Sequence, residues 1–423
     1  MKNINPWAWI PSLYFAEALP YVAVMTISTV MYERLGLSNA DITFYTSLLY
    51  LPWAIKPLWS PFIDLAKSKR WWILTMQILI AISIIGIAFF IPTAGFLIPT
   101  LVFFWIMAFS SATHDIAADG FYMLALNPHE QTLYVGIRST FYRIATIAGG
   151  GLLIMLAGTL ETFTNRIGLS WSVTFYVLAF FFAMVAIYHF FFLPRAKRDT
   201  TKKTDNIFCL LRDFIQTFIS FVKKPQAMAA MLFMLLYRLP EALLLKMTNL
   251  FMIKPISEGG LGLSTQEVGF VQGTVGVMGL TLGGIIGGIV ASRDGLKRWL
   301  WPMVISITIP DLVYVYLSYF QTQDFLLINI LVFIEQFGYG FGFTAYMLFL
   351  IYYSKGKQET SHYAICTAFM ALSMMLPGMV AGDIQERVGY FNFFLIVMVC
   401  CLVTFSVTAL LKIDPNFGKK EPS

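Results

Sequence analysis

Twelve long apolar stretches run through this 423-residue chain, and they constrain its fold more than any other feature. The hydrocarbon core of a bilayer is about 30 Å thick, so a membrane-spanning helix needs about 20 largely apolar residues. Backbone groups in lipid must be hydrogen-bonded within the protein, which favours helices for such stretches. We therefore predict an all-α membrane protein with twelve transmembrane helices, at approximately 7–32, 41–62, 71–91, 97–125, 131–160, 171–193, 226–252, 265–291, 299–320, 325–351, 361–384 and 391–411.

The composition excludes the soluble alternatives. Only 12% of the residues are charged and 58% are hydrophobic, whereas soluble domains carry about 25% charged residues. A soluble enzyme, a disordered protein and a disulfide scaffold are therefore excluded. The spacing of the four cysteines fits neither a zinc site nor a disulfide framework, and we expect no metal and no cofactor; these cysteines are Cys209, Cys366, Cys400 and Cys401.

A polar and basic segment at 194–225 divides the chain into two halves of six spans. We predict an N-terminal bundle at 1–193, a cytoplasmic linker at 194–225, and a C-terminal bundle with a short tail at 226–423. Within the linker, apolar residues at helical spacing over 207–222 predict an amphipathic helix on the membrane surface.

The two halves of the chain repeat short motifs in the same order, EAL at 17–19 and 241–243 and LGLS at 35–38 and 261–264. Such repeats are typical of secondary transporters.

Loop charge predicts the orientation, because cytoplasmic loops collect Lys and Arg. With the N-terminus inside, the inside segments hold 20 of the 29 basic residues and the outside segments hold 4. We expect a multi-pass protein with both termini in the cytoplasm. This bias also explains the net charge of +6 without a nucleic-acid partner.

Charged residues inside the spans are the main candidates for function. A charge in hydrocarbon costs about 2.5–3.5 kcal/mol on insertion scales, so such groups usually face inward and pair. The candidates are Glu17, Lys56, Asp115, Asp119, Arg138, Arg143, Arg238, Glu241 and Glu335. Asp311, beside Pro310, stands apart on the ninth span, where only a local kink or a capping role suggests itself.

The fourth and fifth spans should bring two pairs of charges together. Residues equally distant from the turn of an antiparallel hairpin lie at the same depth, which matches Asp119 with Arg138 and Asp115 with Arg143. These pairs either hold the two spans together or include a group that binds solute or a proton. His114, nearby on the fourth span, fits a hydrogen-bonded helix contact or a proton relay.

Two cytoplasmic loops, after the second and eighth spans, combine an acidic residue with a basic run. They resemble the signature loop of the major facilitator superfamily, although Ser60-Pro61 replaces the usual glycines in the first copy. An acid and a basic cluster at helix ends can form a breakable electrostatic latch; plain positive-inside anchoring is the alternative. The latch candidates are Asp64, Lys67, Arg70, Arg293, Asp294 and Arg298.

A more specific resemblance lies in HDIAADGF at 114–121, LNPHE at 126–130 and YRIA at 142–145. With LWSPFID at 58–64 and EQFGYGFGFTAY at 335–346, these segments resemble the anhydromuropeptide permeases (AmpG-type), which are related to the acetyl-coenzyme A transporters. His114 stands where that family usually has Gln, and Gly120-Phe121 stands for Ala-Tyr.

The resemblance implies a transporter of the bacterial inner membrane. It would import N-acetylglucosamine–anhydro-N-acetylmuramic acid peptides by proton symport for cell-wall recycling. Aromatic rings could stack on the sugars, unless they only pack against lipid or core, and arginines could bind solute carboxylates through bidentate hydrogen bonds. The expected substrate-binding residues are Tyr14, Tyr21, Trp53, Arg143, Arg238, Gln336 and Tyr339, and the proton-coupling candidates are Glu17, Asp115, Asp119, Glu241 and Glu335.

Other functions remain open at this point. The solute could be another amphiphile, such as a coenzyme A ester, a siderophore or a peptide, and a scaffold or lipid flippase could use the same fold. An enzyme is disfavoured, because the four histidines lack metal-ligand spacing and no GxSxG or P-loop motif occurs. We expect a monomer in the lipid bilayer whose partners are the solute and protons.

Overall fold

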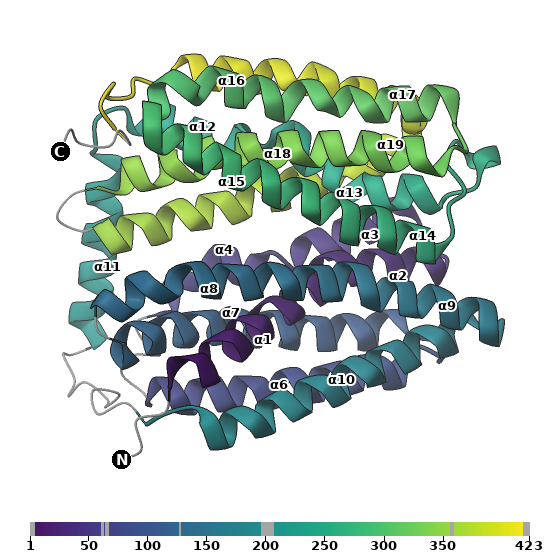
Figure 1. The fold of residues 1–423 in the computed structure, drawn as a ribbon, viewed down its shortest axis with the longest axis horizontal. Coiled ribbons are helices and arrows are strands. Elements are labelled where there is room, and N and C mark those ends of the chain that lie inside the picture. Colours follow the sequence, from purple (N-terminus) through teal and green to yellow (C-terminus); the bar gives the residue numbers. More distant parts are fainter. Residues whose placement is uncertain are drawn as a thin grey trace. The chain divides into compact units, whose positions relative to one another are not determined.

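The computed structural model describes residues 5–60, 63, 67–126, 128–195, 207–355 and 359–417. Every regular element among these residues is helical, which confirms the predicted all-α class (Figure 1). Ten helices in the described part of the chain are long and apolar enough to cross a membrane. The last of them, His362–Ala409, is 48 residues long, enough for two of the predicted spans.

The two exceptions to twelve separate spans have local causes. The predicted second span is interrupted, as α3 (Asn39–Leu48), α4 (Leu51–Ile55) and the 3₁₀ turn η3 (Lys56–Leu58). Pro52 and Pro57 lie in this region, and proline removes a helix hydrogen bond. The eleventh and twelfth spans run together as α19 (Glu359–Ala409), which contains a non-helical residue, Gly389, with φ 78°. A positive φ is accessible to glycine without steric cost.

The chain forms two compact units. The first comprises residues 1–36 and 55–206. Its main helices are α1 (Ile10–Val22), α2 (Ser28–Arg34), α6 (Lys69–Phe90), α7 (Leu97–Ala125), α8 (Pro128–Ile147), α9 (Ile154–Thr164) and α10 (Ile167–Phe192), with π-helical turns η2 (Ala23–Ile27) and η4 (Ala148–Leu153). Within this unit α6 packs against α7 and α10, and α1 packs against α8.

The second unit comprises residues 37–54 and 207–423. Besides α3 and α19 it contains α11 (Ile207–Val222), α12 (Ala227–Leu236), α13 (Leu239–Ile253), α14 (Thr265–Phe270), η6 (Val271–Gly276), α15 (Val277–Asp294), α16 (Leu296–Thr308), η7 (Ile309–Asp311), α17 (Leu312–Phe320) and α18 (Phe325–Ser354). Helices α15 and α18 lie side by side. Glycine permits this approach, because a Cβ at Gly283 or Gly340 would overlap a backbone carbonyl of the facing helix.

Residues 37–54 belong to the second unit because α3 packs against α13 and α19. Asn39 Nδ2 donates hydrogen bonds to Gln385 Oε1 at 2.6 Å and to the Tyr390 hydroxyl at 3.0 Å. Further along, the Gly382 amide donates to Thr43 Oγ1 at 3.0 Å. The division of the chain at 194–225 into two six-helix bundles stays a prediction.

The repeated LGLS segments adopt the same local structure. Gly36 and Gly262 both have positive φ, 86° and 68°, and the serine two residues after each of them caps the next helix. Ser38 Oγ accepts the Asp41 amide at the start of α3, and Ser264 Oγ accepts the Glu267 amide at the start of α14. Serine at this position satisfies one of the unpaired amides of a helix N-terminus. The motif therefore marks the beginning of a helix in both copies.

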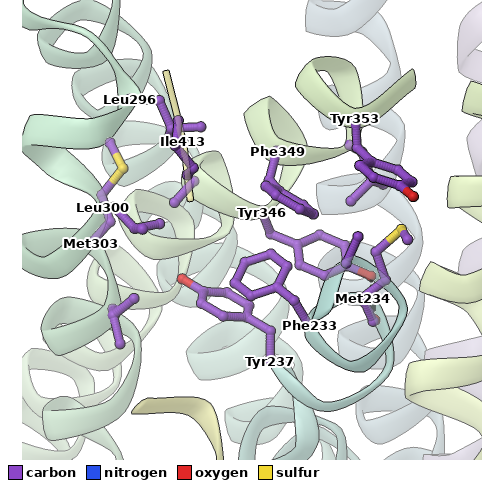
Figure 2. Packing of buried hydrophobic residues seen from close by; sticks show 14 of the residues in the cluster. Phe233, Met234, Tyr237, Leu296, Leu300, Met303, Tyr346, Phe349, Tyr353 and Ile413 are labelled. Carbon is purple, nitrogen blue, oxygen red and sulfur yellow. Dashed lines mark hydrogen bonds between the residues drawn. The ribbon is translucent and has the colours of Figure 1, made fainter. Parts of the chain in front are cut away.

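A large apolar cluster stabilises the second unit (Figure 2). Its buried side chains include Phe233, Tyr237, Tyr346 and Phe349. Phe221 of α11 joins it and stacks on Phe369 with ring centroids 6.1 Å apart. A helix, α11, spans the predicted residues 207–222, and its place on the membrane surface stays a prediction.

Candidate functional site

An ion pair joins α7 and α8 in the first unit. Arg138 Nη2 lies 3.0 Å from Asp119 Oδ1, as their equal distances from the turn between the fourth and fifth spans predict. The Tyr14 hydroxyl donates to the same Asp119 oxygen at 3.2 Å. The Arg138 guanidinium also lies over the rings of Tyr14 and Tyr122, 4.5 and 5.2 Å from their centroids. A carboxylate and two aromatic faces therefore orient this arginine.

The second acidic residue of α7 pairs with a different base. Lys56 Nζ lies 3.7 Å from Asp115 Oδ2. This contact was not predicted, because η3 is far from α7 in sequence. Counting residues from a turn can match only residues of two consecutive spans. Arg143 lies half-buried on α8, and its pairing with Asp115 stays a prediction.

Glu17 completes the charged cluster of the first unit. It lies on α1 with 9% of its surface exposed, within electrostatic range of Asp115, Asp119, Arg138 and Lys56. One carboxylate oxygen, Oε2, has no hydrogen-bond partner among the described residues. A buried carboxylate is costly to keep ionised, and two acids beside it increase that cost. Proton exchange by this cluster stays a prediction.

His114 belongs to a buried polar network that the sequence did not reveal. Gln77 Nε2 lies 3.0 Å from His114 Nε2 and 2.8 Å from His189 Nδ1, and His189 Nε2 lies 2.9 Å from Ser12 Oγ. The network links α7, α6, α10 and α1. It is the hydrogen-bonded helix contact that was one of the two predicted roles of His114.

Arg238 is the central basic group of the second unit. It occupies the interruption between α12 and α13 and is 6% exposed. Its guanidinium lies 4.7 Å from the centroid of the Phe343 ring, and Nη2 donates a hydrogen bond to the Tyr339 hydroxyl. Nε has no hydrogen-bond partner among the described residues. The arginine thus lies against aromatic rings, and its Nε could donate a hydrogen bond to an anion.

Glu335 and Gln336 are adjacent on α18 and bonded to each other. Gln336 Nε2 lies 3.1 and 3.0 Å from the two carboxylate oxygens of Glu335, and the Tyr314 hydroxyl donates to Glu335 Oε2 at 3.2 Å. Gln272 Nε2 in turn donates to the Tyr314 hydroxyl at 3.1 Å. These neutral donors orient the carboxylate without a basic group.

Asp311 lies near the two acidic candidates of the second unit. Oxygen atoms of Glu241, Asp311 and Glu335 all lie within 4.8 Å of one another, and all three residues are buried. A signal for one of these contacts existed in the sequence, because Asp311 lies about eleven residues before the turn at Thr322 and Glu335 about thirteen residues after it.

The latch candidates lie at helix ends. Asp294 accepts Arg293 Nε at 3.3 Å and Trp299 Nε1 at 3.0 Å, and Arg298 Nη1 lies 3.7 Å away. Arg70 instead donates to the backbone oxygens of Leu193 and Phe190, at the end of α10. Lys67 is exposed, and Asp64 lies outside the described residues. The latch function stays a prediction.

The remaining aromatic candidates occupy different elements. Tyr21 lies on α1 and Trp53 on α4, both half-buried. Tyr14 and Tyr339 are the two that the structure shows beside arginines. Stacking of any of these rings on a sugar stays a prediction.

Comparison with known proteins identifies the family. Residues 12–363 match the family described as Major Facilitator Superfamily. The chain belongs to the major facilitator superfamily. Along its sequence it is 25% identical over 437 residues to the anhydromuropeptide permease of Escherichia coli K12, covering 96% of this chain and 81% of that protein. It is 24% identical over 416 residues to a Rickettsia conorii protein named as an AmpG transporter (AmpG 4), covering 96% of each.

Solved structures show the same fold. A point mutant of the nucleoside transporter NupG aligns with a TM-score of 0.74 at 16% identity, covering 96% of this chain and all of that one. A D-xylose–proton symporter aligns with a TM-score of 0.65 at 13% identity, covering 96% and 98%. The predicted major facilitator fold is confirmed. This member of the superfamily is a multi-pass membrane transporter.

Proposed function

We propose that this major facilitator protein imports anhydromuropeptides, N-acetylglucosamine–anhydro-N-acetylmuramic acid peptides, from the periplasm to the cytoplasm. Import would be driven by protons through alternating access and would serve cell-wall recycling in the bacterial inner membrane. The similarity to the E. coli permease along 96% of the chain supports this solute class. The orientation with both termini in the cytoplasm and the monomeric state belong to the same proposal.

The observation that carries the proposal is the environment of Arg238. A muropeptide has carboxylates on its peptide and apolar faces on its sugar rings. Arg238 is buried, stacked near Phe343 and Tyr339, and its Nε has no partner among the described residues. A planar guanidinium can donate two parallel hydrogen bonds to a carboxylate while the neighbouring ring faces contact a sugar. Arg143 is proposed as a second contact to the anionic part of the solute.

Proton coupling is proposed at buried carboxylates in each unit. Glu17 lies beside two ion pairs in the first unit, and Glu335 is held by Tyr314 and Gln336 in the second. We propose these two residues because each is a buried acid on a membrane-spanning helix, and ionisable groups inside the membrane often form proton relays in transporters. Release of the proton on the cytoplasmic side would allow the carrier to return for another solute.

A transport assay tests the proposal. Purified protein in proteoliposomes should accumulate radiolabelled anhydromuropeptide when the lumen is alkaline relative to the outside, and a protonophore should abolish accumulation. Arg238→Lys should reduce uptake, whereas Arg387→Lys, at an exposed arginine paired with Asp383, should not. Uptake of a lipid or a coenzyme A ester in place of the muropeptide would support the alternative solutes and contradict the proposal.

A further inference from the structure

Three acidic side chains converge inside the second unit without a basic partner at ion-pair distance among the described residues. Glu241, Asp311 and Glu335 are 1%, 2% and 1% exposed. One oxygen of each lies within 4.8 Å of the others. Like charges at this separation repel strongly away from water, so the cluster requires bound positive charge or protons.

Interrupted helices supply two of the three carboxylates. Glu241 lies in the first turn of α13, just after the break at Arg238, and Pro240 follows that break. Asp311 ends η7, the 3₁₀ turn that contains Pro310 and separates α16 from α17. In membrane transporters, interrupted helices and their freed backbone groups are where Na⁺ or H⁺ is coordinated.

A close helix contact sets the position of the third carboxylate. A Cβ at Gly338 would overlap the Ser306 carbonyl and lie 2.9 Å from Pro310 Cγ. Glycine at 338 therefore lets α18 approach the end of α16 and the 3₁₀ turn. Since Glu335 lies one turn before Gly338 on α18, this contact brings it to the level of Asp311.

The hydrogen bonds leave one member of the cluster unsatisfied. Glu335 accepts from Tyr314 and Gln336, and Asp311 Oδ2 lies 3.9 Å from Cys401 Sγ. By contrast, neither carboxylate oxygen of Glu241 has a hydrogen-bond partner in the described part of the chain. A buried polar group without a partner is costly. Glu241 faces the other two acids with its full acceptor capacity available.

We propose that Glu241, Asp311 and Glu335 form a binding site for a small hard metal cation, sodium. Carboxylate oxygens are ligands for hard cations. Three oxygens that share a plane with an ion of about the size of calcium, such as sodium, at metal–oxygen distances of about 2.3–2.6 Å lie about 4.0–4.5 Å apart. Oxygens that all lie within 4.8 Å of one another allow this arrangement. Magnesium is a poorer fit, since it needs shorter distances and retains several waters. Asp311, for which the sequence suggested only a local kink or a capping role, is the third ligand.

This site goes beyond the proposed import function and departs from the expectation of no metal. Arg238 is close enough to act electrostatically on Glu241, but it donates its hydrogen bond to Tyr339. The cation would therefore neutralise negative charge of the three acids that Arg238 does not. Sodium and the coupling proton would compete for Glu335, so ion binding is measured at a fixed pH and without solute. Absence of sodium binding would then leave proton-driven muropeptide import open, and absence of transport would leave ion binding open.

Binding of ²²Na⁺ to the purified full-length protein tests the site. We expect saturable binding that unlabelled NaCl displaces and choline chloride does not, together with a rise in Tm in NaCl at constant ionic strength. Asp311→Asn and Glu241→Gln should weaken binding by at least about tenfold. The matched control Asp383→Asn removes an exposed carboxylate and should bind like the wild type.

If these substitutions prevent folding, a variant that leaves all three carboxylates in place can still test the site. Tyr314→Phe removes only the hydroxyl that holds Glu335, and it should lower sodium affinity while preserving the fold. Absence of sodium-specific binding in the wild type would overturn the proposal and leave protons as the only bound cation. Displacement by Ca²⁺ at far lower concentration than by Na⁺, or unchanged binding in all three variants, would also overturn it.

Discussion

The two units differ in the neighbours of the acids that lie inside their spans. In the first unit both acids of α7 form ion pairs. Arg138 lies 3.0 Å from Asp119, and Lys56 lies 3.7 Å from Asp115. In the second unit, three acids lie together with neutral donors around them and no basic group at ion-pair distance among the described residues. Paired charges can switch partners, whereas unpaired acids must take up cations. We therefore expect rearrangement of ion pairs at Asp115 and Asp119 in the first unit, and uptake of protons or ions at Glu17 there and at the three acids of the second unit.

The largest effect should come from removing the buried carboxylates that we propose for proton coupling. Glu17→Gln and Glu335→Gln should each abolish gradient-driven accumulation, because a neutral amide cannot carry a proton, and each should leave solute exchange at zero gradient intact. Glu258→Gln, at an exposed loop carboxylate, is the control. Accumulation by both variants would show that neither residue couples transport to protons.

A smaller effect is expected at the proposed solute contacts. Arg238→Lys should weaken muropeptide binding by about tenfold or more, because lysine lacks the planar fork and a hydrogen bond to a charged group is lost. Arg143→Lys should act in the same direction. Equilibrium binding measured in detergent separates this loss from coupling. If affinity stays unchanged in both variants, neither arginine binds a solute carboxylate.

Thermal stability should change in opposite directions in the two units. Asp119→Asn removes a partner from Arg138 and should cost roughly 1 kcal/mol or less, since the pair is partly exposed. Asp311→Asn removes one of three mutually repelling acids and should raise Tm in sodium-free buffer. Scanning fluorimetry of both variants measures the contrast. A fall in Tm for both would mean that the second cluster is stabilised by contacts other than bound cations.

The smallest effect should be seen at the end of α15, among the latch candidates. Arg293→Gln and Arg298→Gln remove exposed partners of Asp294, so Tm should hardly change because exposed pairs contribute little. If the latch operates, the rate of uptake should still change. Lys297→Gln is the neighbouring control in the same basic run. Equal rates in all three variants would favour simple positive-inside anchoring.

The sequence predicted those features that depend on residues close together in the chain. Apolar length indicated the helical class, the spacing over 207–222 predicted α11, and distance from a turn paired Asp119 with Arg138. The same counting could have matched Asp311 with Glu335, although a mid-span acid beside proline suggests only a kink when taken alone.

Contacts between distant spans were beyond this reasoning. Lys56 beside Asp115, and Gln77 between His114 and His189, depend on packing of helices that are far apart in the chain. The place of residues 37–54 against α19 likewise rests on close packing at Gly382 and on polar contacts such as that of Asn39 with Gln385. One sequence offers no periodicity that encodes such contacts.

The most direct test of proton-driven muropeptide import is proton movement caused by the solute itself. Proteoliposomes with a trapped pH-sensitive dye and no imposed pH gradient would receive anhydromuropeptide on the outside. The account predicts acidification of the lumen that depends on solute concentration and is lost in Glu335→Gln. Entry of the labelled solute with no change in lumenal pH, when electrical potential is clamped, would contradict proton symport.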